Sequence, residues 1–167
     1  MNNSWFTVKL KYLKELDNGV LKNVTEPFVV DAVSFTDAES RIVSEIGSTL
    51  RGEYLITGIT KTDYADIFLY EDSDDWYKCK ITYETIDGDN GKTKKISNYF
   101  LVTANNIKEA YDRIQENLSD FLVDIEIPNI ALTNIVEVLP YVPNEMNTKV
   151  EQTVASHEST FEDETEL

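Results

Sequence analysis

The chain repeats itself, and this duplication restricts the fold more than any other feature of the sequence. The two copies are offset by 71 positions in the first strand, by 72 from the first turn through the helix, and by 71 again in the strand after the helix. Self-similarity at a fixed offset indicates two copies of one supersecondary unit. The matching pairs include Trp5 and Trp76, Lys9 and Lys80, Tyr12 and Tyr83, Phe28 and Phe100, Arg41 and Arg113, Ile42 and Ile114, and Ile56 and Ile127.

Each copy has the sequence pattern of a β-β-α-β-β unit. Apolar and polar residues alternate in the first strand of each copy, and Asn18-Gly19 and Asn90-Gly91 are typical hairpin turns. Capping boxes at Thr36 to Glu39 and Asn106 to Glu109 predict the two helices. The predicted strands are 5–13, 20–30, 54–60, 66–70, 76–86, 92–102, 123–127 and 131–139, and the predicted helices end near 48 and 119.

These elements predict an α+β protein, a tandem pseudo-repeat with antiparallel sheets and helices on one side. The pattern allows either two sheets or one pseudo-symmetric sheet. We expect one duplicated domain over 1–141, with repeats of about 4–71 and 75–141. The polar stretch 142–167 lacks apolar periodicity and is predicted to be an acidic disordered tail.

The charge is strongly negative and concentrated in two stretches. The formal net charge is −16 for 167 residues, and both 63–75 and 142–167 are rich in Asp and Glu. Such a chain has no diffuse attraction to nucleic acid or to an anionic membrane, so such a partner must be bound by a local patch. A lone cysteine, Cys79, and the absence of a long apolar run predict a soluble cytoplasmic protein.

A candidate patch lies on the strand faces opposite the apolar sets. In the first strand Phe6, Val8 and Leu10 share one parity, so the odd positions face the other way. Aromatic rings beside lysines suit single-stranded DNA, since each stacked base contributes about 1 to 3 kcal/mol and lysines contact phosphates. The candidate residues are Trp5, Lys9, Lys11, Trp76, Lys78, Lys80, Lys95 and Tyr99.

The tryptophans of this patch have two alternative roles that involve no DNA. The tryptophans could instead close the sheet ends or fill the interface between the halves, while the lysines only face solvent.

The tail, with Phe161, Glu162, Asp163 and Glu164, could occupy a basic groove or recruit a basic protein. It is partly similar to the acidic tails of phage and bacterial single-strand binding proteins. It could also serve only for solubility.

Common catalytic chemistry finds little support. The one histidine, His157, lies in the tail, and the six glycines form no phosphate-binding loop. No paired acids mark a site for carboxylate catalysis. We therefore expect no enzyme, no cofactor and no metal site.

The segments Trp5 to Lys9, Thr25 to Ala32 and Ser34 to Glu39 resemble an uncharacterised domain family of Bacteroidetes and their crAss-like phages. The resemblance covers roughly 4–141 and implies a phage or mobile-element setting. In fold, the tandem units are similar to whirly and transcriptional-coactivator-type single-strand DNA-binding proteins.

The leading hypothesis is a non-enzymatic single-stranded DNA-binding protein with an acidic regulatory tail. The alternative is an acidic protein-interaction factor, such as an inhibitor, a nucleic-acid mimic or a virion component. The expected partners are single-stranded DNA, a basic protein at the tail, and another copy of the chain, with no membrane.

Overall fold

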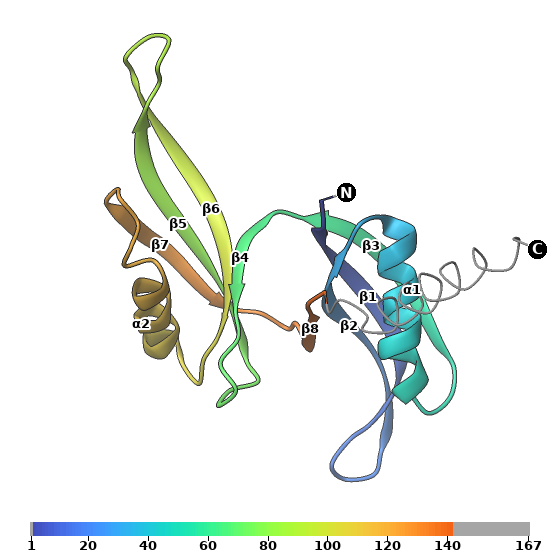
Figure 1. Cartoon of the computed structure of the whole chain (residues 1–167). Coiled ribbons are helices and arrows are strands. Elements are labelled where there is room, and N and C mark those ends of the chain that lie inside the picture. The colour runs from blue at the N-terminus through green and yellow to red at the C-terminus, as the bar shows by residue number, and fades with distance from the viewer. Residues whose placement is uncertain (1, 142–167) are drawn as a thin grey trace, which may run out of the picture.

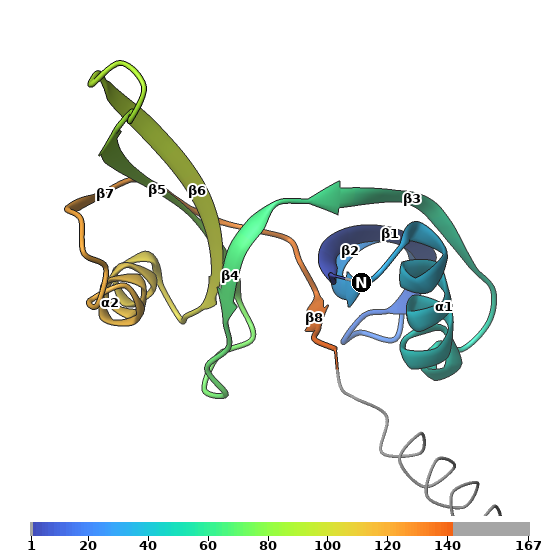
Figure 2. The same cartoon turned by 45° about the horizontal axis from the view of Figure 1, so that its top comes forward.

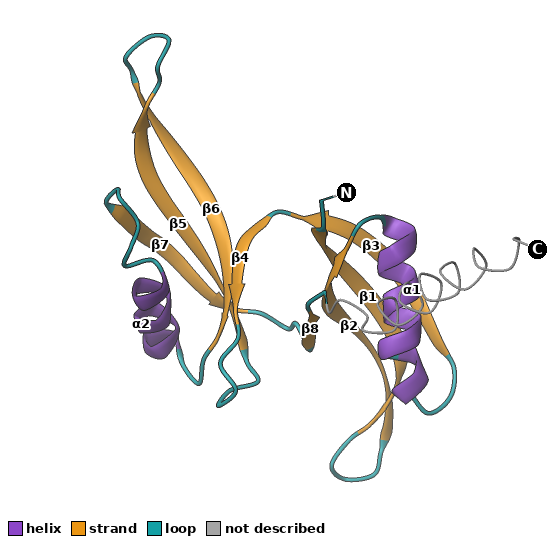
Figure 3. Cartoon of the chain, in the orientation of Figure 1, coloured by secondary structure: helices purple, strands orange, loops and turns teal. Residues whose placement is uncertain are grey.

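The computed structural model describes residues 2–141, which form two four-stranded sheets and two α-helices (Figures 1 and 3). This confirms the α+β class. A single turn of 3-10 helix, Gly47–Thr49, follows the first helix. The elements are β1 (Ser4–Glu15), β2 (Leu21–Ala32), α1 (Phe35–Glu45), β3 (Tyr54–Thr62), β4 (Tyr64–Phe68), β5 (Trp76–Ile86), β6 (Thr93–Thr103), α2 (Ile107–Asn117), β7 (Ile125–Leu132) and β8 (Glu137–Leu139).

Of the two arrangements that the sequence allows, the chain adopts two sheets. Sheet A has the strand order β3-β1-β2-β8, and sheet B has the order β4-β6-β5-β7. Helix α1 covers one face of sheet A and helix α2 one face of sheet B, so the helices lie on opposite outer sides of the molecule (Figure 2). The long hairpins β1-β2 and β5-β6 extend in opposite directions (Figure 1).

The two units exchange their last strands. Strand β4 of the first unit pairs with β6 of sheet B, and β8 of the second unit pairs with β2 of sheet A. Both pairings are parallel and share one register, because Ile67 lies opposite Leu101 just as Val138 lies opposite Val29. The exchange joins the halves through backbone hydrogen bonds.

The helices begin at equivalent caps. The Ser34 hydroxyl accepts a hydrogen bond from the Asp37 amide (3.1 Å), and the Asn106 side chain accepts one from the Glu109 amide (2.9 Å). The expected N-cap at Asn106 is thus confirmed, whereas Thr36 lies inside α1 and the cap is two residues earlier. The sequence signal was ambiguous because Ser34 and Thr36 are both good N-cap residues.

The second unit corrects two predicted strands. One continuous strand, β7, replaces the expected break between 127 and 131, and only Glu137–Leu139 of the stretch 131–139 forms β8. Pro128 lies within β7. An edge strand tolerates proline because one side of it needs no ladder hydrogen bond, and β7 pairs only with β5.

Three apolar clusters hold the molecule together. One lies beneath α1 and includes Val8 and Ile42, and a second beneath α2 includes Cys79 and Ile114. The third lies between the sheets, where Val29, Trp76 and Leu101 are buried. Among the described residues, neither helix has the length and apolar character needed to cross a bilayer.

Candidate nucleic-acid interface

Each sheet has a face without a helix, and we call these the helix-free faces. Side chains alternate along a strand, and Val8, Leu10 and Cys79 are fully buried beneath the helices. The interleaved residues therefore project from the helix-free faces. These are Lys9 and Lys11 on β1, Lys78 and Lys80 on β5, and Lys95 and Tyr99 on β6.

The lysines form two rows that run outward from the centre of the molecule. Each row begins beyond the tryptophan at the start of its strand and continues toward the hairpin tip. Within residues 2–141, the ion pairs do not include Lys9, Lys11, Lys78 or Lys80. These four ammonium groups keep their charge available for an anionic ligand.

Lys95 differs from the other four lysines. Its ammonium lies 3.3 Å from the Glu126 carboxylate, and both side chains are exposed. Exposed pairs of this kind contribute little to stability. A phosphate could replace the carboxylate at small cost.

Lys78 lies among aromatic rings. Its ammonium is 4.5 Å from the centroid of Tyr99 and 5.9 Å from that of Tyr64. Cation–π attraction holds the charge beside these rings. Tyr99 is 37% exposed and offers ring surface to solvent, whereas burial raises the pKa of the half-buried Tyr64.

The equivalent residues Lys9 and Lys80 lie beside irregularities in the edge strands. Lys9 pairs with Gly58 where β3 shifts register, and Lys80 pairs with Asn129 where β7 does. Bulges often redirect side chains at functional sites. Because Gly58 has no side chain, the stem of Lys9 is left uncovered on that side.

The prediction that both tryptophans face solvent is wrong for Trp76. Its side chain is 4% exposed and packs with Val29 and Leu101 between the sheets. Trp5 is half-buried against the same cluster. Strand parity placed the indoles correctly away from the helices, but the other sheet covers that end of the face. Trp76 therefore cannot offer a ring to a base, and the interface-filling alternative describes it.

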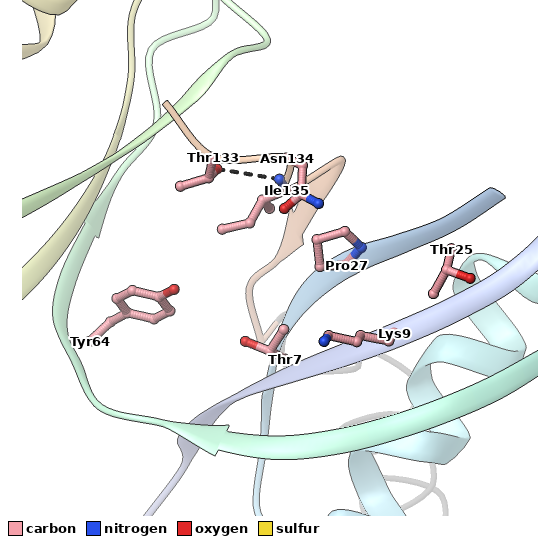
Figure 4. Close-up of a pocket in the computed structure, with 8 residues that line it drawn as sticks. All are labelled: Thr7, Lys9, Thr25, Pro27, Tyr64, Thr133, Asn134 and Ile135. Carbon is pink, nitrogen blue, oxygen red and sulfur yellow. Dashed lines mark hydrogen bonds between the residues drawn. The ribbon is translucent and has the colours of Figure 1, made fainter. Parts of the chain in front are cut away.

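A cavity of about 350 Å³ opens on the helix-free face of sheet A, between the two units. Figure 4 shows the Lys9 side chain extending toward Thr7 on one side, with Tyr64 and the segment after β7 on the others. Its lining contains no carboxylate. The lining residues are Thr7, Lys9, Thr25, Pro27, Tyr64, Thr133, Asn134 and Ile135.

The lining of this cavity, apart from Lys9, was not foreseen from the sequence. The sequence pattern predicts a connection at Tyr64 and a strand at Ile135, whereas Tyr64 begins β4 and Ile135 lies in the connection before β8, and strand exchange brings the two together. A comparison of the two repeats could have indicated this cavity. At the equivalent places the second unit has Lys78 and Tyr99 instead of Thr7 and Pro27, so larger side chains occupy that face.

The remaining polar groups have structural partners or no visible ligand role. Arg113 is buried and binds the Thr103 carbonyl (2.7 Å) and the Asp72 carboxylate (2.6 Å). Burial raises the pKa of the Cys79 thiol to about 12, which keeps it protonated and unreactive. In the part of the chain that the structure describes, no cluster of His, Cys, Asp or Glu is arranged to hold a metal.

The predicted tail site, Phe161 to Glu164, lies outside the described residues. The other candidates are all placed, and apart from the buried Trp76 they divide between the two helix-free faces: Trp5, Lys9 and Lys11 on sheet A, and Lys78, Lys80, Lys95 and Tyr99 on sheet B.

Comparison with known proteins identifies a family for this chain. No curated protein and no solved structure matches the chain. A family model described as a domain of unknown function, DUF4494, matches residues 4–141, which include both units and both helix-free faces. The chain therefore belongs to the DUF4494 family.

Proposed function

We propose that this protein binds single-stranded DNA without catalysing a reaction, using the lysines of the two helix-free faces. The observation that carries the proposal is the set of four lysines, Lys9, Lys11, Lys78 and Lys80, none of which takes part in an ion pair within residues 2–141. In a chain of net charge −16, unpaired lysines on the helix-free faces favour the binding of an anionic ligand there.

The aromatic part of the proposal rests on Tyr99 and on the exposed part of Trp5. Base stacking is tolerant of sequence because every base presents a π face. Tyr99 stands beside Lys78, so a base on the ring would bring its phosphate near an ammonium. We assign no base contact to Trp76.

The setting and the tail complete the proposal. We propose a phage or mobile-element protein that acts in the host cytoplasm, and an acidic tail that competes with DNA for the lysines. The tail carries seven acidic residues and one lysine. Ending the chain at residue 142 is therefore expected to tighten DNA binding.

The test measures the anisotropy of a labelled thymidine oligonucleotide at several salt concentrations. Replacing Lys78 and Lys80 with alanine should weaken binding by roughly tenfold or more and reduce the salt slope by about 0.7 for each phosphate that the variant no longer neutralises. The control replaces Lys61 and Lys108, which removes the same charge away from the helix-free faces. Equal weakening by both double variants, or no binding by the shortened chain, contradicts the proposal.

One observation favours the alternative of a protein-interaction factor. The six acidic residues of the stretch 63–75 are all exposed, and of these only Asp72 forms an ion pair within residues 2–141, with Arg113. Such a surface suits a basic partner through electrostatic complementarity. A protein that binds no oligonucleotide but retains a basic protein in a salt-sensitive manner would support this function.

A further inference from the structure

The cavity on sheet A has the polar groups of an anion site. Lys9 supplies a positive charge, while the Thr25, Tyr64 and Asn134 side chains supply further donors. Thr7 and Thr133 are already engaged, with the Thr62 hydroxyl (2.7 Å) and the Trp76 carbonyl (2.8 Å). Two other cavities of the described chain contain acidic lining residues, such as Glu126 and Glu53. The cavity on sheet A is therefore favourable for an anion despite the overall charge.

The same cavity has an apolar wall. Pro27 and Ile135 line it beside the donors, and the Tyr64 ring lies across from them (Figure 4). Its volume of about 350 Å³ is at the small end of the range for ligand pockets, roughly 300 to 1,000 Å³. An elongated ligand with one anionic end and one flat apolar end fits these walls.

We propose that this cavity holds a single nucleotide of the bound strand, with its phosphate at Lys9 and its base against Pro27 and Ile135. The inference rests on the proposed function. It adds a binding site (the nucleotide seat) for one nucleotide to a surface that otherwise contacts the sugar-phosphate backbone of the DNA. A nucleotide fits both walls of the cavity. Its phosphate accepts hydrogen bonds from the donors near Lys9, and its planar, weakly polar base packs against Pro27 and Ile135.

The second unit explains why there is one seat per chain. There the residues equivalent to Thr7 and Pro27 are Lys78 and Tyr99, and the Lys78 ammonium lies directly over the Tyr99 ring. Larger side chains thus stand at the positions that correspond to Thr7 and Pro27. The second unit is thus suited to stacking on its surface, and the first unit to enclosing a nucleotide.

The experiment titrates the full chain with thymidine monophosphate and follows methyl signals by NMR. The Thr25, Thr133 and Ile135 methyl groups report on the cavity, and the exposed Ile107 methyl group on α2 is the internal reference. The cavity signals are expected to shift with saturation at one nucleotide per chain, while Ile107 stays unchanged.

Two variants test the assignment. Lys9→Ala should weaken nucleotide binding by about tenfold, because it removes a hydrogen bond to a charged group. Its matched control is Lys61→Ala, which removes the same charge from the helix-covered face of sheet A and should leave nucleotide binding unchanged. The double change Thr7→Lys with Pro27→Tyr copies the second unit and should abolish the shifts.

The outcomes separate this inference from the proposed function. If the oligonucleotide binds but neither ligand shifts the cavity signals, the nucleotide seat is wrong and the proposed function stands. If thymidine monophosphate shifts them and the oligonucleotide does not bind, the seat is supported and the proposed function fails. Equal affinity for inorganic phosphate would overturn the contact of the base with Pro27 and Ile135.

Discussion

The two units of the molecule share one architecture and differ on their helix-free faces. Beneath the helices the duplicated positions are filled alike, as with Ile42 and Ile114, which are both fully buried. On the opposite faces Thr7 and Pro27, which line a cavity, correspond to Lys78 and Tyr99, whose side chains contact each other. The framework of the unit is thus duplicated, whereas the surface proposed to bind DNA differs between the two copies.

The largest expected difference concerns the two tryptophans. Trp76→Ala removes a buried ring between the sheets and should lower the free energy of unfolding by about 3 to 5 kcal/mol. Trp5→Ala should cost about 1 to 2 kcal/mol, because part of its ring is already in water. Urea unfolding followed by circular dichroism measures both. Equal losses would show that the two rings are equally buried.

The equivalent arginines should differ next. Arg113 is 8% exposed, forms ion pairs with Asp72 and Glu109, and lies 4.1 Å from the Tyr70 ring centroid. Arg41 is slightly more exposed, and within residues 2–141 its one ion pair is with Glu45. We expect Arg113→Ala to lower the free energy of unfolding by about 2 to 3 kcal/mol and Arg41→Ala by about 1 kcal/mol.

Both arginines also bind a backbone carbonyl at the end of the second strand, Asp31 for Arg41 and Thr103 for Arg113. This common hydrogen bond is why neither substitution should be silent. A larger loss from Arg41→Ala than from Arg113→Ala in the same unfolding experiment would contradict the assigned roles.

The hairpin turns offer a smaller and more local comparison. Gly19 and Gly91 have positive φ angles of 77° and 66°, whereas Gly88, in the same loop as Gly91, does not. Alanine at either of the first two positions should cost about 1 kcal/mol, since the left-handed region disfavours a Cβ atom. Gly88→Ala is the control and should change the thermal midpoint very little. A similar shift from Gly88→Ala would refute the turn assignment.

The smallest effect is expected where Cys79 replaces the Val8 of the first unit. Cys79→Val restores that side chain and should change stability at neutral pH by less than about 1 kcal/mol. Because burial raises the pKa of the native thiol to about 12, the unfolded thiol ionises first as pH rises above about 9. Wild-type stability should therefore fall relative to Cys79→Val in alkaline solution. Parallel curves for both proteins up to about pH 11 would rule out this cause.

The sequence predicted what local pattern determines. Strand alternation placed β1 and β5, and the paired Asn-Gly turns and Asn106 cap marked the hairpins and the start of α2. Parity also placed Lys9 and Lys80 away from the helices. These features depend on neighbours three or four residues away at most.

Features that depend on distant contacts could not be predicted. No local signal shows that β4 pairs with β6 or that β8 pairs with β2. That exchange buries Trp76 and brings Tyr64 into the cavity that Lys9 lines, so both the error and the unforeseen cavity have one origin. How the two halves of a duplicated chain pack against each other depends on tertiary contacts, which a local sequence pattern does not reveal.

The most direct test of the central claim maps the surface that single-stranded DNA contacts on the full chain. Backbone amide signals are followed by NMR as a thymidine oligonucleotide is added. We predict shifts on β1, β5 and β6 around Lys9, Lys80 and Tyr99, and none on the outer surfaces of α1 and α2. Shifts confined to the helices, or no shifts at any oligonucleotide concentration, would contradict the claim.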